Sequence, residues 1–170
     1  MFRYHIRPVR QDDLRELAAI AQVEAECFPP EEAASPDTLR ARAKAFPESF
    51  LAAEEDTPDE GRIIGFINGC VTDERTIRDE MFEDISLHRP QGAYQSIFGL
   101  DVVPDRRRNG VAAALMEALI AKARSAGRKG LILTCKERLI PYYERFGYRN
   151  MGVSRSVHGG AVWYDMILEF

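Results

Sequence analysis

The chain has 170 residues, of which 45% are hydrophobic and 29% charged, so we expect one globular domain over residues 1–170. No run of about 18 apolar residues and no apolar signal core occur, so we expect a cytoplasmic protein with no membrane partner. Its net charge is only −4, and its cysteines, Cys27, Cys70 and Cys135, lie far apart without metal-ligand spacing, which argues against disulfides and against a metal site.

The first 46 residues carry the pattern of one strand followed by two helices. Residues 2–9 alternate between apolar and polar side chains, which is typical of a half-buried strand. Acidic residues at 12 and 13 open a helix with a buried stripe at helical spacing, and Pro29 ends it. Ser35 is expected to cap a second helix, because a short hydroxyl side chain can accept the first unpaired N–H groups.

The next segment is expected to form a hairpin and then a loop. Residues 50–53 and 62–71 look like two strands joined by an acidic turn over residues 54–61. Residues 72–94 are the hardest to interpret, and only the amphipathic stretch 77–82 suggests a short helix.

The second half of the chain alternates between strands and helices. Residues 94–103 are predicted to form one strand, and residues 110–126 a strong helix that Gly127 ends. The remaining predicted elements are a strand at 131–134, a short helix at 137–146 and a last strand at 162–168. The order indicates an α/β (α+β) fold with a mixed sheet, with room for one more strand.

Charge is distributed unevenly along the chain. Residues 1–85 hold 20 acidic and 10 basic residues, a difference of −10, whereas residues 86–170 hold 7 acidic and 13 basic residues, a difference of +6. A basic half suits a polyanionic ligand and an acidic half suits a cationic one, although solvated surface is the commoner explanation for such charge runs.

Residues 100–112 join a predicted strand to a predicted helix through a glycine-bearing turn. Unpaired N–H groups at a helix start, together with the helix dipole, form an anion site. Gly110 lets the backbone approach a phosphate, and Ala112 keeps the next side chain small. Three arginines at 106–108 add positive charge, and arginine binds phosphate oxygens in a bidentate way. A basic helix cap without a ligand is the alternative.

This turn contains neither GxGxxG nor a Gly-Lys-Ser/Thr loop. It resembles the Arg/Gln-x-x-Gly-x-Gly/Ala signature of the GNAT superfamily of N-acetyltransferases, with Arg107, Gly110 and Ala112 at the defining positions. The resemblance implies a mixed, mostly antiparallel sheet with flanking helices and two splayed central strands. It also implies acetyl-CoA as cosubstrate, with the pantetheine arm against the strand and the pyrophosphate on the turn. The expected cofactor-binding residues are Leu100, Asp101, Val102, Val103, Arg107, Arg108, Asn109, Gly110, Val111, Ala112 and Ala113.

A narrower resemblance covers most of the chain. Residues 135–148 are similar to the corresponding segment of the arylalkylamine (serotonin) N-acetyltransferases, and so are the Leu-His-Arg-Pro stretch at 87–90 and the glycines around 65–69. This resemblance implies that Tyr143 protonates the leaving thiolate of CoA. A phenol, with a pKa near ~10, stays protonated at neutral pH. Tyr142 points about 100° away around the helix and is assigned to packing. The oxyanion donor is expected near Val102.

The resemblance breaks at the general base. The vertebrate serotonin enzymes have two histidines on the strand before the turn, and the matching residues here are Ser96 and Phe98. We therefore consider three replacements: a water held by Ser96, His88 on its loop, or Asp101, although alternation along a continuous strand would point Asp101 away from that face. His5 and His158 are interpreted as ordinary polar residues.

The acceptor is expected to be a small primary amine. Phe28 and Phe98 would form apolar walls around it, and the acidic first half could attract it as an ammonium ion. A polyamine, an aminoglycoside or a protein lysine are alternatives, as is a non-catalytic acyl-CoA sensor. A homodimer is left open. Nucleic-acid binding is not expected, because one short basic turn is too small and the pI is near 5.5.

Overall fold

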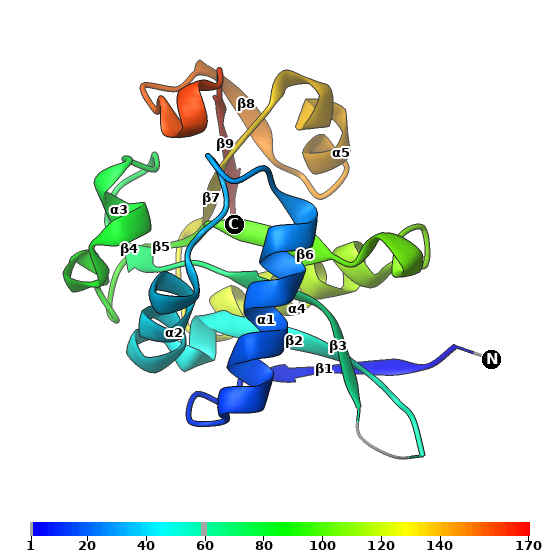
Figure 1. The fold of residues 1–170 in the computed structure, drawn as a ribbon. Coiled ribbons are helices and arrows are strands. Elements are labelled where there is room, and N and C mark those ends of the chain that lie inside the picture. Colours follow the sequence, from blue (N-terminus) through cyan, green and yellow to red (C-terminus); the bar gives the residue numbers. More distant parts are fainter. Residues whose placement is uncertain (1, 59–60) are drawn as a thin grey trace. The chain divides into compact units, whose positions relative to one another are not determined.

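The computed structural model describes residues 2–58 and 61–170, so Asp59 and Glu60 of the predicted acidic turn lie outside the described residues. The chain forms two compact units, which are described separately. Unit 1 comprises Met1–Asn68 and Gly99–Leu119, and unit 2 comprises Gly69–Phe98 and Ile120–Phe170. Both units contain helices and a sheet, which confirms the predicted α/β class (Figure 1).

Unit 1 contains a four-stranded antiparallel sheet in the order β1-β2-β3-β6. The strands are β1 (Tyr4–Pro8), β2 (Phe50–Glu55), β3 (Arg62–Asn68) and β6 (Gly99–Val102). The two rings of Phe50 and Phe66 pack at 5.5 Å within its core. The predicted hairpin of β2 and β3 is confirmed, and β6 forms one edge of the sheet.

Helices α1 (Leu14–Cys27) and α2 (Pro36–Ala45) pack in unit 1 (Figure 1). Helix α2 begins at the predicted cap Ser35, and α1 begins just after the acidic residues 12 and 13 that were expected to open it. The Asp13 carboxylate accepts the N–H groups of residues 15 and 16 at 3.0 and 3.1 Å, and Ser35 Oγ accepts that of Thr38 at 3.1 Å. Leu17, Ile20 and Val23 form the buried stripe of α1, so apolar burial determines which face contacts the sheet.

Unit 2 contains a five-stranded mixed sheet in the order β4-β5-β7-β9-β8. The strands are β4 (Val71–Thr72), β5 (Tyr94–Ile97), β7 (Gly130–Cys135), β8 (Arg149–Val153) and β9 (Tyr164–Glu169). Only the β5–β7 pair is parallel among the described strands, with Ile97 beside Leu133. The sequence did not place β8, whose residues are mostly exposed or half-buried and so lack a strong apolar signal.

Two predicted strands are wrong as continuous elements. Residues 62–71 divide into β3 and β4, and residues 94–103 divide into β5 and β6, with the two halves in different sheets. Glycines mark both breaks. At Gly69 a Cβ atom would lie 2.0 Å from the Ser96 carbonyl oxygen, so only glycine permits this close backbone approach. Apolar periodicity reports which faces are buried, but not which partner strand buries them.

The later helices follow the prediction more closely. Helix α4 (Val111–Ser125) is followed by Gly127, whose φ of 76° turns the chain out of the helix. The Arg128 N–H donates back to the Ala123 carbonyl oxygen at 3.1 Å. The predicted helix at 137–146 is shorter, with a 3-10 turn followed by α5 (Ile140–Glu144). Helix α3 (Glu80–Glu83) is a single turn. Over the described ranges, no helix combines the length and apolar character needed to cross a membrane.

Candidate functional site

The predicted anion-binding turn lies in unit 1 between β6 and α4 (Figure 1). Arg108 and Gly110 both have left-handed backbone, with φ angles of 66° and 79°, and within residues 2–58 and 61–170 no other non-glycine residue has a positive φ. An L-residue in this region costs about 1–2 kcal/mol. Left-handed residues before a helix turn several N–H groups toward one side, where the first turn of the helix adds further donors.

Gly110 leaves open space in front of this turn. It is exposed, and a Cβ atom built on it would meet nothing within 4 Å among the described atoms. The backbone can therefore come within hydrogen-bonding distance of a ligand oxygen at this point. This geometry fits a phosphate or pyrophosphate group, as the sequence predicts.

Two of the three arginines stabilise the turn itself. Arg106 Nη2 lies 2.7 Å from a carboxylate oxygen of Glu55, and its guanidinium lies 5.0 Å above the Phe2 ring. Arg107 Nε donates to the Val102 carbonyl oxygen at 3.0 Å. The Asn109 side chain donates to the carbonyl oxygens of residues 106 and 107, both at 3.1 Å. Arg108 is exposed and carries the strained backbone, so the structure assigns different roles to the three cations.

Val102 lies at the exit of the edge strand β6. The Val103 N–H donates to the Ile64 carbonyl oxygen of β3 at 2.9 Å, so the N–H and carbonyl of Val102 point toward the opposite edge. The carbonyl oxygen accepts from Arg107, and Cys27 Sγ lies 3.4 Å away as a second donor. The Val102 N–H, which is the expected donor to an oxyanion, therefore lies on the edge of β6 that does not pair with β3.

Asp101 is fully buried in unit 1 next to a second acid, Glu24. Both carboxyl oxygens of Asp101 are buried, and a hydrogen bond with Glu24 is among the causes that raise the pKa of Asp101. Burial, followed by the charge of Glu24, raises the pKa of Asp101 well above its ordinary range, and Arg42 opposes this effect. Asp101 therefore retains a proton that an exposed carboxyl group would lose.

The raised pKa of Asp101 links stability to pH. The folded protein retains a proton on Asp101 that the unfolded chain releases above about pH 4. The free energy of unfolding therefore falls as the pH rises from that value through the raised pKa. The expectation that alternation directs Asp101 away from Ser96 assumed one continuous strand, whereas the chain breaks between these residues.

Ser96 and His88 both hold the backbone of unit 2. Ser96 is fully buried, and its hydroxyl donates to the Cys70 carbonyl oxygen at 2.7 Å. His88 Nδ1 accepts the Val71 N–H at 3.0 Å. A neutral imidazole that accepts at Nδ1 carries its proton on Nε2, so this tautomer has no second acceptor atom. These contacts give both residues a structural role beside β4.

Tyr143 lies half-buried on the short helix α5 in unit 2. Its ring contacts Tyr142 edge-on at 5.2 Å and Tyr148 at 6.0 Å. Burial, followed by the neighbouring Tyr143, raises the pKa of Tyr148 well above its ordinary range. This aromatic packing joins the α5 side chains to Tyr148, just before β8, and limits the rotamers of Tyr143.

The two predicted walls of the acceptor pocket lie in different units. Phe28 caps the end of α1 in unit 1, where its N–H donates to the Glu24 carbonyl oxygen at 3.1 Å. Phe98 follows β5 in unit 2, and its ring contacts Phe82 at 5.1 Å. His158, which the sequence indicated to be an ordinary polar residue, also stacks on Phe82, with ring centroids 4.8 Å apart. No local motif could have indicated this cluster, because its rings come from distant segments.

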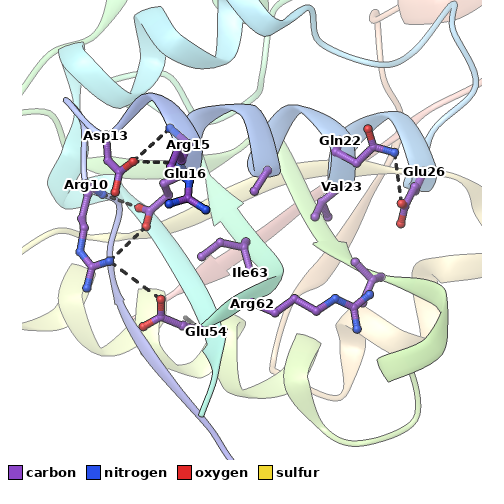
Figure 2. A pocket seen from close by; sticks show the side chains of 13 residues that line it. Arg10, Asp13, Arg15, Glu16, Gln22, Val23, Glu26, Glu54, Arg62 and Ile63 are labelled. Atoms are coloured by element: carbon purple, nitrogen blue, oxygen red, sulfur yellow. Dashed lines mark hydrogen bonds and ion pairs between the residues drawn. The ribbon is translucent and has the colours of Figure 1, made fainter. Parts of the chain in front are cut away.

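A charged groove of about 590 Å³ lies in unit 1 between α1 and the β2–β3 hairpin (Figure 2). Its main charges are already paired. Glu16 accepts from Arg7 at 2.5 and 3.1 Å, and Arg7 also holds Glu54 at 3.1 Å. The hydrogen bond from Arg7, the largest effect on Glu54, lowers the pKa of that carboxyl. Arg62 forms an ion pair with Asp105 at 2.9 Å. This groove is therefore a neutralised polar surface beside the sheet.

The described part of the chain brings no three histidine, cysteine, aspartate or glutamate side chains together in a group that could hold a metal ion. The three cysteines are free thiols, with Cys70 and Cys135 buried. Burial raises the pKa of Cys135 to about 11, so it remains a protonated thiol at neutral pH.

Comparison with known proteins gives a match over most of the chain. Residues 17–148 match the acetyltransferase (GNAT) family. The chain is 28% identical over 110 residues to serotonin N-acetyltransferase of Mesocricetus auratus, which covers 64% of this chain and 51% of that protein. It is 30% identical over 95 residues to serotonin N-acetyltransferase of Macaca mulatta, covering 55% and 45%. The chain thus spans about half the length of the curated relatives it matches.

Solved structures with the same fold include two with CoA derivatives. The GphF GNAT-like decarboxylase in complex with isobutyryl-CoA superimposes with a TM-score of 0.79 at 21% identity, covering 97% of this chain and 98% of that one. A GNAT family acetyltransferase from Brucella melitensis in complex with acetyl-CoA gives a TM-score of 0.60 at 21% identity, covering 99% and 88%. At this identity the likeness shows the fold alone.

Proposed function

The chain belongs to the acetyltransferase (GNAT) family, and from this premise we propose that it transfers the acetyl group of acetyl-CoA to the primary amine of a small molecule. The observation that carries the proposal is the turn after β6, where left-handed Arg108 and Gly110 precede α4 and leave room for a phosphate. The curated relatives favour an arylalkylamine as the acceptor class.

The remaining cofactor contacts follow from the same elements. The edge strand β6 offers the backbone of residues 100–103 to the pantetheine arm, and residues 108–113 offer N–H groups to the pyrophosphate. Strand β6 is suited to bind the pantetheine arm because the edge that faces away from β3 does not pair within the unit 1 sheet. In our proposal, the Val102 N–H stabilises the oxyanion that develops on the thioester carbonyl.

Tyr143 is our candidate for the proton donor to the thiolate of CoA. It lies on the helix that follows β7, at the position that matches the donor in the resembling family. A phenol remains protonated at neutral pH and can give its proton when the carbon–sulfur bond breaks. Ser96 already donates its hydroxyl proton to Cys70, so any catalytic part for Ser96 would use its oxygen as an acceptor.

The function is tested by measuring thiol release from acetyl-CoA in the presence of tryptamine, phenethylamine, spermidine and a lysine-containing peptide. An arylalkylamine N-acetyltransferase should show kcat/KM at least about tenfold higher for the two aromatic amines, a difference of about 1.4 kcal/mol in transition-state binding. A preference for spermidine or for the peptide would instead identify the acceptor as a polyamine or a protein lysine. Tight acetyl-CoA binding without release on any amine would instead indicate an acyl-CoA sensor.

A further inference from the structure

Unit 1 contains a buried polar cluster next to the strand that we propose binds acetyl-CoA. Its members, each at most 6% exposed, are Glu24 of α1, Arg42 of α2, Asn68 of β3 and Asp101 of β6. A Cβ atom built on Gly99 would lie 3.1 Å from Asp101 Oδ1, 3.7 Å from Asn68 Nδ2 and 3.8 Å from Glu24 Oε1. Side chains from three elements therefore converge beside this glycine. Arg42 Nη1 donates to Asn68 Oδ1 at 3.2 Å, which joins α2 to the same cluster.

The Glu24 carboxylate connects two separate parts of unit 1. Its Oε2 accepts the Ala34 N–H at 2.8 Å, in the segment between α1 and α2. Burial comes first among the causes that raise the pKa of Asp101, followed by the charge of Glu24 and a hydrogen bond with it. Since Glu24 already accepts a backbone N–H, the proton of that hydrogen bond belongs to Asp101, whose O–H donates to Glu24.

The Asp101 side chain is attached next to the peptide unit that carries the Val102 N–H. This peptide unit is planar, so its direction is set by rotation about the Asp101 and Val102 backbone bonds alone. Within the sheet, Asp101 lies opposite Phe66 of β3, and Val102 lies opposite Gly65. The Val102 N–H points toward the other edge of β6, so the β3 ladder does not hold it directly. A buried anchor on Asp101 therefore limits the directions available to this N–H.

Cys27 gives α1 a second contact with β6, one residue further along the strand. It lies three positions after Glu24, so the two side chains share one face of the last turn of α1. Cys27 Sγ lies 3.4 Å from the Val102 carbonyl oxygen, which also accepts from Arg107 Nε at 3.0 Å. The end of α1 thus contacts two consecutive residues of β6. Buried polar networks of this kind favour one arrangement, because each bond that breaks leaves a desolvated group.

Stability alone does not explain a buried pair of acids at this position. Burial of a carboxyl group costs free energy, and apolar side chains of similar volume in place of such a pair are often equally stable or more stable. Helix α1 buries the apolar residues Ile20 and Val23 just before Glu24. A hydrogen-bonded pair of acids fixes a direction, which apolar packing does not.

We propose that Glu24 and Asp101 are positioning residues for acetyl transfer, because their buried hydrogen bond directs the Val102 N–H toward the oxyanion of the thioester. This inference rests on the proposed function. Neither carboxyl group touches the substrate, and both act through the Val102 peptide group. An oxyanion donor stabilises the transition state most when its direction is fixed before the reaction. A displacement of about 1 Å costs about 100-fold in rate.

The test compares apolar and amide variants of the two acids by thiol release from acetyl-CoA with the preferred amine. Glu24→Ala and Asp101→Leu each remove the hydrogen bond, so kcat per acetyl-CoA site should fall about 100-fold, with the KM for acetyl-CoA within about threefold of wild type. Glu24→Gln and Asp101→Asn each keep a hydrogen bond between the two side chains, so kcat should remain at least about tenfold above that of the apolar variants. Isothermal titration with acetyl-CoA counts the folded sites, so loss of folded protein does not enter kcat.

Glu26→Ala is the matched control. Glu26 lies on the same turn of α1 but is exposed, and its carboxylate accepts from Gln22 at 3.3 Å (Figure 2). This variant should leave kcat and both KM values within about twofold of wild type. The double variant Glu24→Ala/Asp101→Leu should lose no more than about threefold beyond the larger single loss, because both changes break the same bond. Losses that multiply would overturn the inference, since the two residues would then act independently.

The outcomes separate this inference from the proposed function. Wild-type turnover that Glu24→Ala retains within about threefold would overturn the positioning role and leave acetyl transfer intact. Equal losses in the alanine and glutamine variants would also overturn it, because the hydrogen bond would then not determine the rate. Absence of turnover by the wild-type protein on every amine would overturn both proposals. If Glu24→Ala folds poorly, as judged by its melting temperature, Asp101→Leu decides by the same limits, since an apolar residue suits a buried position.

Discussion

The turn after β6 can be tested with two glycines that share the same geometry. Gly110 has a φ of 79° and Gly127 a φ of 76°, and a Cβ atom built on either would meet nothing within 4 Å among the described atoms. They lie at opposite ends of α4. Alanine at either position therefore adds the same methyl group to the same strained backbone, and only one of the two faces the proposed phosphate site.

The cost to stability should be equal in the two variants. An L-residue in the left-handed region loses about 1–2 kcal/mol relative to glycine. For a chain of this size each kcal/mol lowers the melting temperature by about 2–4 °C, so each variant should lose about 2–8 °C. Steric contact adds nothing to this cost, because the space around both positions is open.

The cost to acetyl-CoA binding should differ. The methyl group of Gly110→Ala would occupy the place where a phosphate oxygen approaches the backbone, so we expect the Kd for acetyl-CoA to rise at least about tenfold, or about 1.4 kcal/mol. Gly127→Ala should leave the Kd within about twofold of wild type. Isothermal titration of acetyl-CoA into the three proteins measures both effects at a temperature well below their melting points.

Kd values for both variants that stay within about twofold of wild type would refute the reasoning. That result would mean that the left-handed turn is a strained helix start without a phosphate, which is the alternative that the sequence left open. Equal affinity loss in both variants would point to the same conclusion, because it would track stability rather than position.

Three further predictions concern the rest of the site. Tyr143→Phe should lower kcat about 100-fold with little change in the KM for acetyl-CoA, whereas Tyr142→Phe should behave like wild type; similar kcat losses in both would assign Tyr143 to packing. Phe98→Ala should raise the KM of the preferred amine about tenfold through lost apolar contact, and an unchanged KM would remove Phe98 from the acceptor pocket. Asp101→Asn removes the carboxyl whose pKa is raised in the folded state, so its melting temperature relative to wild type should increase from pH 4 toward pH 8. A difference that does not change with pH would contradict the buried proton.

The sequence alone identified the elements whose signals are local. Ser35 caps α2 as predicted, and α1 opens at the acidic residues 12 and 13, because a capping side chain and the N–H groups that it binds are within three residues of one another. Gly127 ends α4 for the same reason. The cofactor turn belongs to this class, since Arg107, Gly110 and Ala112 lie within six consecutive residues.

Elements whose definition depends on a distant partner were predicted less well. The segments around Gly69 and Gly99 each look like one long strand, and only the pairing with other strands reveals that each divides between two sheets. Asp101 was placed by assuming continuity through that second break. Its burial beside Glu24 depends on the packing of α1, which no local pattern reports.

The sequence by itself determined the family, the α/β class and the turn proposed to hold acetyl-CoA, because these depend on short runs of residues that must be contiguous to function. The tertiary structure alone decided where the chain leaves one sheet for another, that Asp101 is buried beside a second acid, and that His158 meets Phe82 and Trp163. Such contacts join residues that lie far apart in the chain, and apolar periodicity records only that a side chain is buried, never which residues surround it.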